Sequence, residues 1–132
     1  MLFIIMTLTI LINSCRKTDT NNGSIVKNGT YIGTFQRQVS GGGIISNVTI
    51  TFSSSDWSGQ SQYQKYPALC GGTYKISAAG QIAFENSCPW TAEFDWSFIL
   101  SGDYKLIADG NNIEISKDYN DLFKDVYKLT RQ

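Results

Sequence analysis

Side chains that could carry out acid–base or nucleophilic chemistry are few in this chain, which contains no histidine. Histidine is the commonest general base and the usual middle member of a nucleophilic triad, so its absence removes both arrangements. The closest pair of carboxylates is Glu93 and Asp95. Residues at this spacing do not face each other on a helix, although they share a face on a strand. We interpret the pair as part of a solvated loop.

Two further segments contain residues of catalytic or metal-binding types without the context that such sites need. Residues 101–104 offer a serine hydroxyl but no partner base and no strand–turn–helix setting, so they do not predict a nucleophile elbow. Residues 109–112 offer oxygen ligands but lack the calcium-loop pattern and a bidentate glutamate, and we interpret them as a turn. We therefore predict a protein that is not an enzyme, and we expect no metal site and no cofactor.

The first twelve residues are almost wholly apolar, and residues 12–15 read Ile-Asn-Ser-Cys. The run is too short to span about 30 Å of hydrocarbon as a helix, and it has the length of the apolar region of a signal peptide. It resembles a bacterial lipoprotein signal peptide that ends in a lipobox. The resemblance implies cleavage before Cys15 and attachment of lipid to that cysteine, which would anchor the protein to a membrane almost permanently.

Two features of this segment leave alternatives open. No lysine or arginine precedes Arg16, whereas a signal peptide usually begins with positive charge; either the true start lies upstream of Met1 or the free amine supplies the charge. The apolar run could also be a first strand or a buried helix, although the polar residues 16–22 favour a flexible tether. Because Arg16 rather than aspartate follows Cys15, the resemblance favours the outer membrane of a Gram-negative bacterium.

The sequence predicts one folded domain C-terminal to this segment. Residues 1–14 are the expected signal peptide, residues 15–28 the lipidated cysteine and its tether, and residues 29–132 a domain long enough to bury a substantial core. Eleven basic residues balance eleven acidic ones, so we expect no nucleic-acid partner. With Cys15 assigned to lipid, Cys70 and Cys88 most simply form a disulfide in an exported protein. The alternative is a pair of buried free thiols.

Alternation of apolar and polar residues with a period of two predicts eight short strands. Their expected ranges are 29–39, 44–53, 57–63, 72–77, 81–85, 104–108, 112–117 and 125–131. Trp90, Phe94 and Phe98 recur at four-residue spacing, which predicts a short helix between residues 88 and 100. Eight antiparallel strands with tight turns predict an all-β, closed up-and-down barrel without exposed edges. A two-sheet β-sandwich is the alternative.

At the two ends of this strand series the chain resembles the lipocalin-like, or calycin, group of barrels. Those proteins carry Gly-x-Trp on the first strand, matched here by Gly29-Thr30-Tyr31, and an arginine on the last strand, matched by Arg131. The resemblance implies a lipocalin-like fold in which this arginine covers the closed end of the barrel. We predict that Tyr31 and Arg131 meet at one end, with the guanidinium stacked on the ring within about 6 Å.

Aromatic residues, mostly on the predicted inward faces, and Arg131 are the candidates for ligand binding. The set is Tyr31, Phe35, Trp57, Tyr74, Trp96, Tyr104 and Arg131. Aromatic residues fill the core of most small domains, and the sharper hypothesis is that some of these line a cavity for a small apolar molecule. We therefore expect a membrane-anchored envelope lipoprotein that binds a small apolar ligand. The alternative is a protein-interaction or inhibitor module of lysozyme-inhibitor type that acts through surface loops on an unidentified protein.

Overall fold

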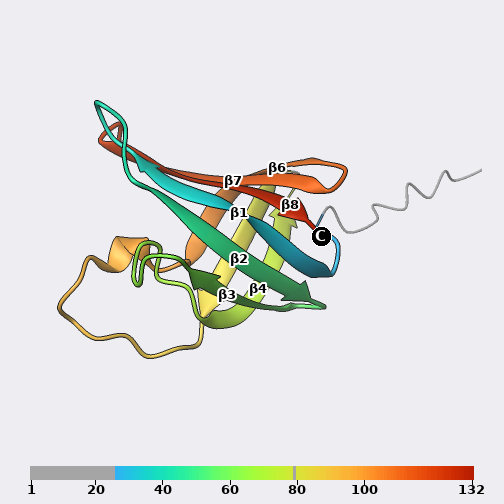
Figure 1. The fold of residues 1–132 in the computed structure, drawn as a ribbon. Coiled ribbons are helices and arrows are strands. Elements are labelled where there is room, and N and C mark those ends of the chain that lie inside the picture. The colour runs from blue at the N-terminus through green and yellow to red at the C-terminus, as the bar shows by residue number, and fades with distance from the viewer. Residues whose placement is uncertain (1–25, 79) are drawn as a thin grey trace, which may run out of the picture.

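The strands follow one another around a closed barrel (Figure 1). The computed structural model describes residues 26–78 and 80–132, so the expected signal peptide and Cys15 lie outside the described residues. The strands are β1 (Gly29–Gln38), β2 (Ile45–Ser53), β3 (Asp56–Ser61), β4 (Gly71–Ala78), β5 (Gln81–Asn86), β6 (Gly102–Asp109), β7 (Asn112–Tyr119) and β8 (Phe123–Arg131). Each pairs antiparallel with the next, and β8 pairs with β1. The predicted all-β up-and-down barrel is confirmed, and the sandwich is excluded.

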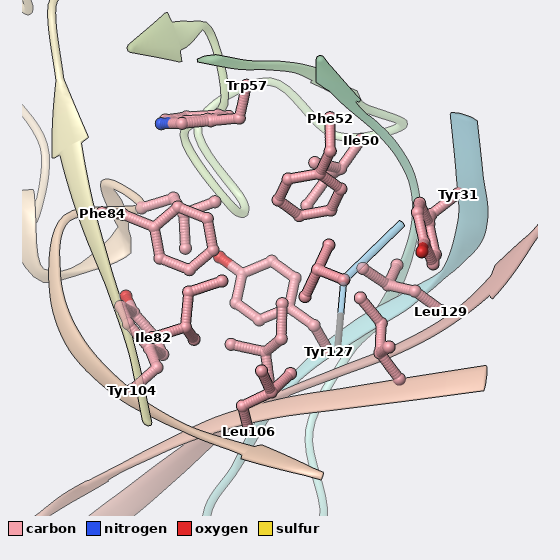
Figure 2. Close-up of a cluster of buried hydrophobic side chains, with 14 of the residues drawn as sticks. Tyr31, Ile50, Phe52, Trp57, Ile82, Phe84, Tyr104, Leu106, Tyr127 and Leu129 are labelled. Carbon is pink, nitrogen blue, oxygen red and sulfur yellow. The ribbon is translucent and has the colours of Figure 1, made fainter. Parts of the chain in front are cut away.

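Alternation along the strands places one set of side chains inside the barrel. In β2, for example, Ser46, Val48, Ile50 and Phe52 are buried, and the residues between them are exposed or half-buried. Figure 2 shows the resulting cluster, in which side chains from several strands contact one another across the interior. Burial of each large apolar side chain contributes roughly 1.5–3 kcal/mol. The filled interior is therefore the main source of the barrel's stability.

The barrel has two unlike ends. The loop end carries the connections at residues 39–44, 62–70, 87–101 and 120–122, whereas the tether end carries Val26, the short turns after β2, β4 and β6, and the C terminus. Gln38 at the end of β1 is the register partner of Lys124 in β8. The tips of the β1–β2 and β7–β8 hairpins accordingly project side by side from the loop end (Figure 1).

The helix expected between residues 88 and 100 is reduced to a single 3-10 turn, η1 (Trp96–Phe98). Trp90 and Phe94 contact each other edge to face, whereas Phe98 packs against the hydrophobic core. The four-residue spacing of these rings thus reflects contacts in two separate places and not one helical face. Within the described residues, no helix is both long and apolar enough to cross a membrane.

Candidate functional site

The seven predicted ligand residues fall into three environments. Five of them, Tyr31, Phe35, Trp57, Tyr74 and Tyr104, lie in or against the hydrophobic core, and Figure 2 shows three of these among the packed side chains. Their rings contact other rings: the centroids of Phe35 and Tyr127 are 4.8 Å apart, and those of Trp57 and Phe84 are 5.8 Å apart. The structure therefore brings these five together as packed core residues. Arg131 lies at the tether end and Trp96 at the loop end.

Tyr31 and Arg131 meet at the tether end as register partners of β1 and β8, which confirms the first part of that prediction. The guanidinium, however, lies against the backbone of Gly29, where a Cβ would come within 2.9 Å of Nε. Its Nε–H donates to the Asn28 carbonyl at 2.8 Å. Among the described residues, Arg131 is not one of the cations that stack on a ring. The Tyr31 hydroxyl instead donates a hydrogen bond to the Lys27 carbonyl and accepts one from the Lys27 amide. The chain that leads into β1 therefore covers this end.

The loop end is closed by a buried ion pair that the sequence analysis missed. Arg37 and Asp125 are 7% and 1% exposed. Two hydrogen bonds join them, from Nε to Oδ1 at 2.7 Å and from Nη2 to Oδ2 at 2.8 Å. The guanidinium carbon lies 3.7 Å from the ring centre of Phe98 and 4.1 Å from that of Phe123. Bidentate pairing and ring stacking hold a guanidinium in one orientation, and we name these four residues the plug.

Burial and hydrogen bonding act in opposite directions on the pKa of Arg37. Desolvation disfavours the charge on Arg37, but the hydrogen bond and the charge of Asp125 outweigh it and raise the pKa of Arg37 above its usual value. Burial raises the pKa of Tyr104, Tyr119 and Tyr127 nearby. Their phenols therefore stay neutral, and the ion pair supplies the charge at this end of the interior.

A signal for the plug was present in the sequence. The alternation that predicts Phe35 and Leu129 on the inward faces also directs Arg37 and Asp125 inward. A charge at an inward position needs a partner of opposite sign, because burial of an unpaired charge is costly. The predicted pairing of Tyr31 with the last strand also sets the register that puts Arg37 opposite Asp125.

The two long connections at the loop end are tied together. Cys70 and Cys88 form the predicted disulfide, with their Cα atoms 6.3 Å apart. The Lys65 ammonium lies 3.5 Å from the Glu93 carboxylate and 4.9 Å from the ring centre of Phe94. One covalent bond and these side-chain contacts therefore fix residues 62–70 and 87–101 relative to each other.

Asp95 connects the plug to the exposed surface. Its Oδ2 accepts a hydrogen bond from Arg37 Nη1 at 3.3 Å, and its Oδ1 caps η1 by accepting from the Ser97 amide at 2.9 Å. The hydrogen bonds from Ser97, and then Arg37, lower the pKa of Asp95. Glu93 and Asp95 thus pair with different cations, Lys65 and Arg37.

Exposed apolar side chains gather at the loop end. Among the described residues, eight large hydrophobic side chains are well exposed; six of them, Val39, Ile44, Ile45, Tyr63, Trp96 and Leu122, lie there, and Ile32 and Ile107 lie on the barrel wall. Leu122 is 74% exposed and Ile44 65% exposed, each on a hairpin tip. Trp96 is 57% exposed, and its indole N–H donates to the Thr91 carbonyl at 2.8 Å. We name the six residues the loop-end surface.

Comparison of the chain with protein-family models, with curated proteins and with solved structures finds no match. The barrel has the strand number and the antiparallel up-and-down order that the calycin resemblance implies. One end of the barrel is closed by the incoming chain, which bonds to Tyr31, and the other end is closed by the plug.

Proposed function

We propose that this protein is a lipid-anchored, calycin-like lipoprotein of the cell envelope that binds a protein partner through its loop-end surface. The proposal is carried by the placement of six exposed hydrophobic side chains at one end of the barrel, against two on the wall of the described structure. Large exposed apolar patches on soluble domains mark interaction sites. The lipid at Cys15 and the outer-membrane location are taken from the resemblance of residues 1–15 to a lipoprotein signal.

The kinds of side chain at the loop end suit a protein interface. Aromatic residues are enriched at such interfaces, and tryptophan and tyrosine carry much of their binding energy. Trp96 is held in place before binding, because its indole bonds to Thr91 and the turn that carries it is fixed to Arg37 through Asp95. A preorganised side chain loses less conformational entropy on association.

The interior is less suited to binding a small apolar ligand than the loop-end surface is to binding a protein. Phe35, Tyr74 and Trp57 each pack against another ring of the interior, and both ends of the barrel are covered. At the loop end a ligand would have to displace the plug and break the bidentate pair of Arg37 and Asp125. We therefore propose the surface, and not the interior, as the binding site.

The arrangement of the two ends fits an anchored protein. The described chain begins at Val26, at the tether end, so a lipid at Cys15 would leave the loop end on the side of the barrel away from its point of attachment. Residues 15–25 would reach at most about 40 Å from the membrane when fully extended. A partner protein could then approach the loop-end surface without contacting the bilayer.

Photo-crosslinking in the protein's own cells tests the proposal. A photoreactive phenylalanine placed in the full-length chain at Ile44, Trp96 or Leu122 should give the same discrete protein adduct from all three positions. Ile32 and Ile107 are exposed to a similar extent on the barrel wall and serve as matched controls that should give none. Adding Leu122→Glu should reduce the adduct from position 44 by about tenfold, which corresponds to about 1.4 kcal/mol. Adducts from the wall alone, or adducts with lipid alone, would refute it.

A further inference from the structure

The outer wall formed by β1, β2 and β3 carries almost no charge. Its outward positions are Thr30, Ile32, Thr34, Gln36, Gln38, Ile45, Asn47, Thr49, Thr51, Ser53, Asp56, Ser58 and Gln60. Ten of the thirteen are uncharged polar residues, and Asp56, at the start of β3, is the one charged member. We name this wall the neutral face.

The wall formed by β6, β7 and β8, which adjoins the neutral face where β8 pairs with β1, differs sharply. Among the twelve outward positions of β6, β7 and β8, seven are charged: Asp103, Lys105, Asp109, Glu114, Asp118, Lys124 and Lys128. A surface with about 25–35% charged residues of both signs is the composition that favours solubility of a small domain. The neutral face is therefore not an ordinary solvated wall, and its composition calls for a separate explanation.

The side chains of the neutral face stand in rows across the strands. Thr30 lies opposite Thr51, and Thr51 lies opposite Ser58; the hydroxyls of Thr30 and Thr51 are 3.1 Å apart. Thr49 lies opposite Gln60 in the next row. Rows on one face of a sheet are about 7 Å apart along the strands, and neighbouring strands are about 4.8 Å apart.

A shallow depression lies among these rows. Its volume is about 380 Å³, and it is lined by Thr30, Thr49, Thr51, Ser58, Gly59, Gln60 and Cys70. Hydroxyl groups both donate and accept hydrogen bonds, and a carboxamide offers one group of each kind. The depression therefore presents many donors and acceptors within a small area and no formal charge.

We propose that the neutral face binds an uncharged polysaccharide chain built from hexopyranose units. Sugar hydroxyls donate and accept in the same way as threonine, serine and glutamine side chains, and pairing neutral groups leaves no buried charge uncompensated. An anionic polymer would require lysine or arginine, which none of the outward positions of β1, β2 and β3 provides. The successive rows give an extended chain repeated points of attachment. Ile45 belongs to both surfaces, but none of the loop-end residues lines the depression, so this inference does not depend on the proposed function.

Nuclear magnetic resonance of the ¹⁵N-labelled full-length protein in detergent micelles tests this inference. The probes are cellohexaose, maltohexaose, laminarihexaose and chitohexaose, with hexagalacturonate as the charged counterpart. At least one neutral hexasaccharide should shift amides of β1, β2 and β3 saturably, and addition of about 0.5 M NaCl should not weaken binding, because salt screens charge interactions and none is involved. Hexagalacturonate should leave these amides unchanged.

Substitutions in the central rows locate the site. Thr49→Glu should weaken binding at least about tenfold, whereas Thr49→Ser, which keeps the hydroxyl, should stay within about twofold of the original protein. Asn112→Glu, at an outward position of β7, is the matched control and should not change binding. If Thr49→Glu unfolds the barrel, Ser58→Glu replaces it.

Four results of the sugar titrations would overturn the inference. They are the absence of any shift with all four neutral sugars, shifts confined to other strands, binding that survives both Thr49→Glu and Ser58→Glu in folded protein, and binding of the hexagalacturonate alone. Concentration-dependent shifts of the same amides without sugar would instead show that a second copy of the chain covers the neutral face, which would also overturn it.

Discussion

At the scale of single residues, the bidentate pair of Arg37 and Asp125 is the contact on which closure of the loop end depends. Asp125→Ala would leave a buried guanidinium without its partner, and we expect it to lower the free energy of unfolding by about 3–5 kcal/mol. Replacing both charges, as in Arg37→Met with Asp125→Leu, should cost much less, because the desolvation cost is removed together with the attraction. Urea denaturation of the three proteins measures the difference.

The exposed carboxylate of Asp103, on the outer side of β6, provides the control for this comparison. Asp103→Ala should change the free energy of unfolding by no more than about 0.5 kcal/mol. A loss below about 1 kcal/mol for Asp125→Ala would mean that the plug contributes little to stability. Rings of Phe98 and Phe123 alone would then be enough to close the barrel.

At the scale of elements, η1 presents Trp96 and is capped by a carboxylate that titrates. Hydrogen bonds from Ser97, and then Arg37, lower the pKa of Asp95 in the folded protein. The stabilisation is therefore present above the unfolded value of about 3.9 and is lost as the pH falls through the folded value. Because this carboxylate is largely exposed, solvent screening keeps the effect small.

The predicted consequence is a local change at Trp96 on acidification. The NMR signal of its indole N–H should move as the pH is lowered from about 5 to about 2, while that of the buried Trp57 indole should stay in place over the upper part of this range. In Asp95→Asn the Trp96 signal should no longer respond. An unaltered response in this variant would assign the pH dependence to a different carboxylate.

The two long connections form a second element whose rigidity can be tested. Cys70 and Cys88 are 18 residues apart in the chain, and closing such a loop stabilises by about 3 kcal/mol on the chain-entropy model. Cys70→Ser with Cys88→Ser should lower the free energy of unfolding by about that amount. Hydrogen exchange should accelerate in residues 62–70 and 87–101 and change little in β1 and β8. Equal acceleration in all strands would show that the disulfide supports the whole barrel.

Strands and loops differ in how far they could be predicted from the sequence. A strand with one buried face must alternate buried apolar and exposed polar residues. Segments such as residues 44–53 can therefore be recognised as strands from the sequence. The register of β1 with β8 followed from the predicted meeting of Tyr31 and Arg131, and the same register would have placed Arg37 opposite Asp125. Residues 87–101 could not be predicted, because tertiary contacts such as the disulfide and the plug determine their path. Spacing alone also cannot distinguish the exposed Trp96 from Phe98, which is partly buried against the core.

At the scale of the whole molecule, three regions occupy different parts of the barrel. The tether end receives the incoming chain, the loop end exposes apolar side chains, and the neutral face lies on the wall between them. The packed interior keeps these regions fixed relative to one another (Figure 2). A change at one region is therefore expected to leave the others unaltered, which allows each proposal to be tested separately.

Attachment of the whole molecule to the membrane depends, in our proposal, on Cys15. Each methylene of an attached acyl chain adds about 0.8 kcal/mol of membrane affinity, so several chains act as a nearly permanent anchor. We predict that Cys15→Ala moves the protein to the soluble fraction or leaves an unprocessed precursor of higher peptide mass; cell fractionation and mass spectrometry measure both. The urea denaturation curve of the barrel should not change, because the described core lies within residues 26–132. The variant Cys70→Ser with Cys88→Ser should remain in the membrane fraction, since its signal is intact. Membrane attachment and mass that are both unaltered in Cys15→Ala would show that this cysteine carries no lipid.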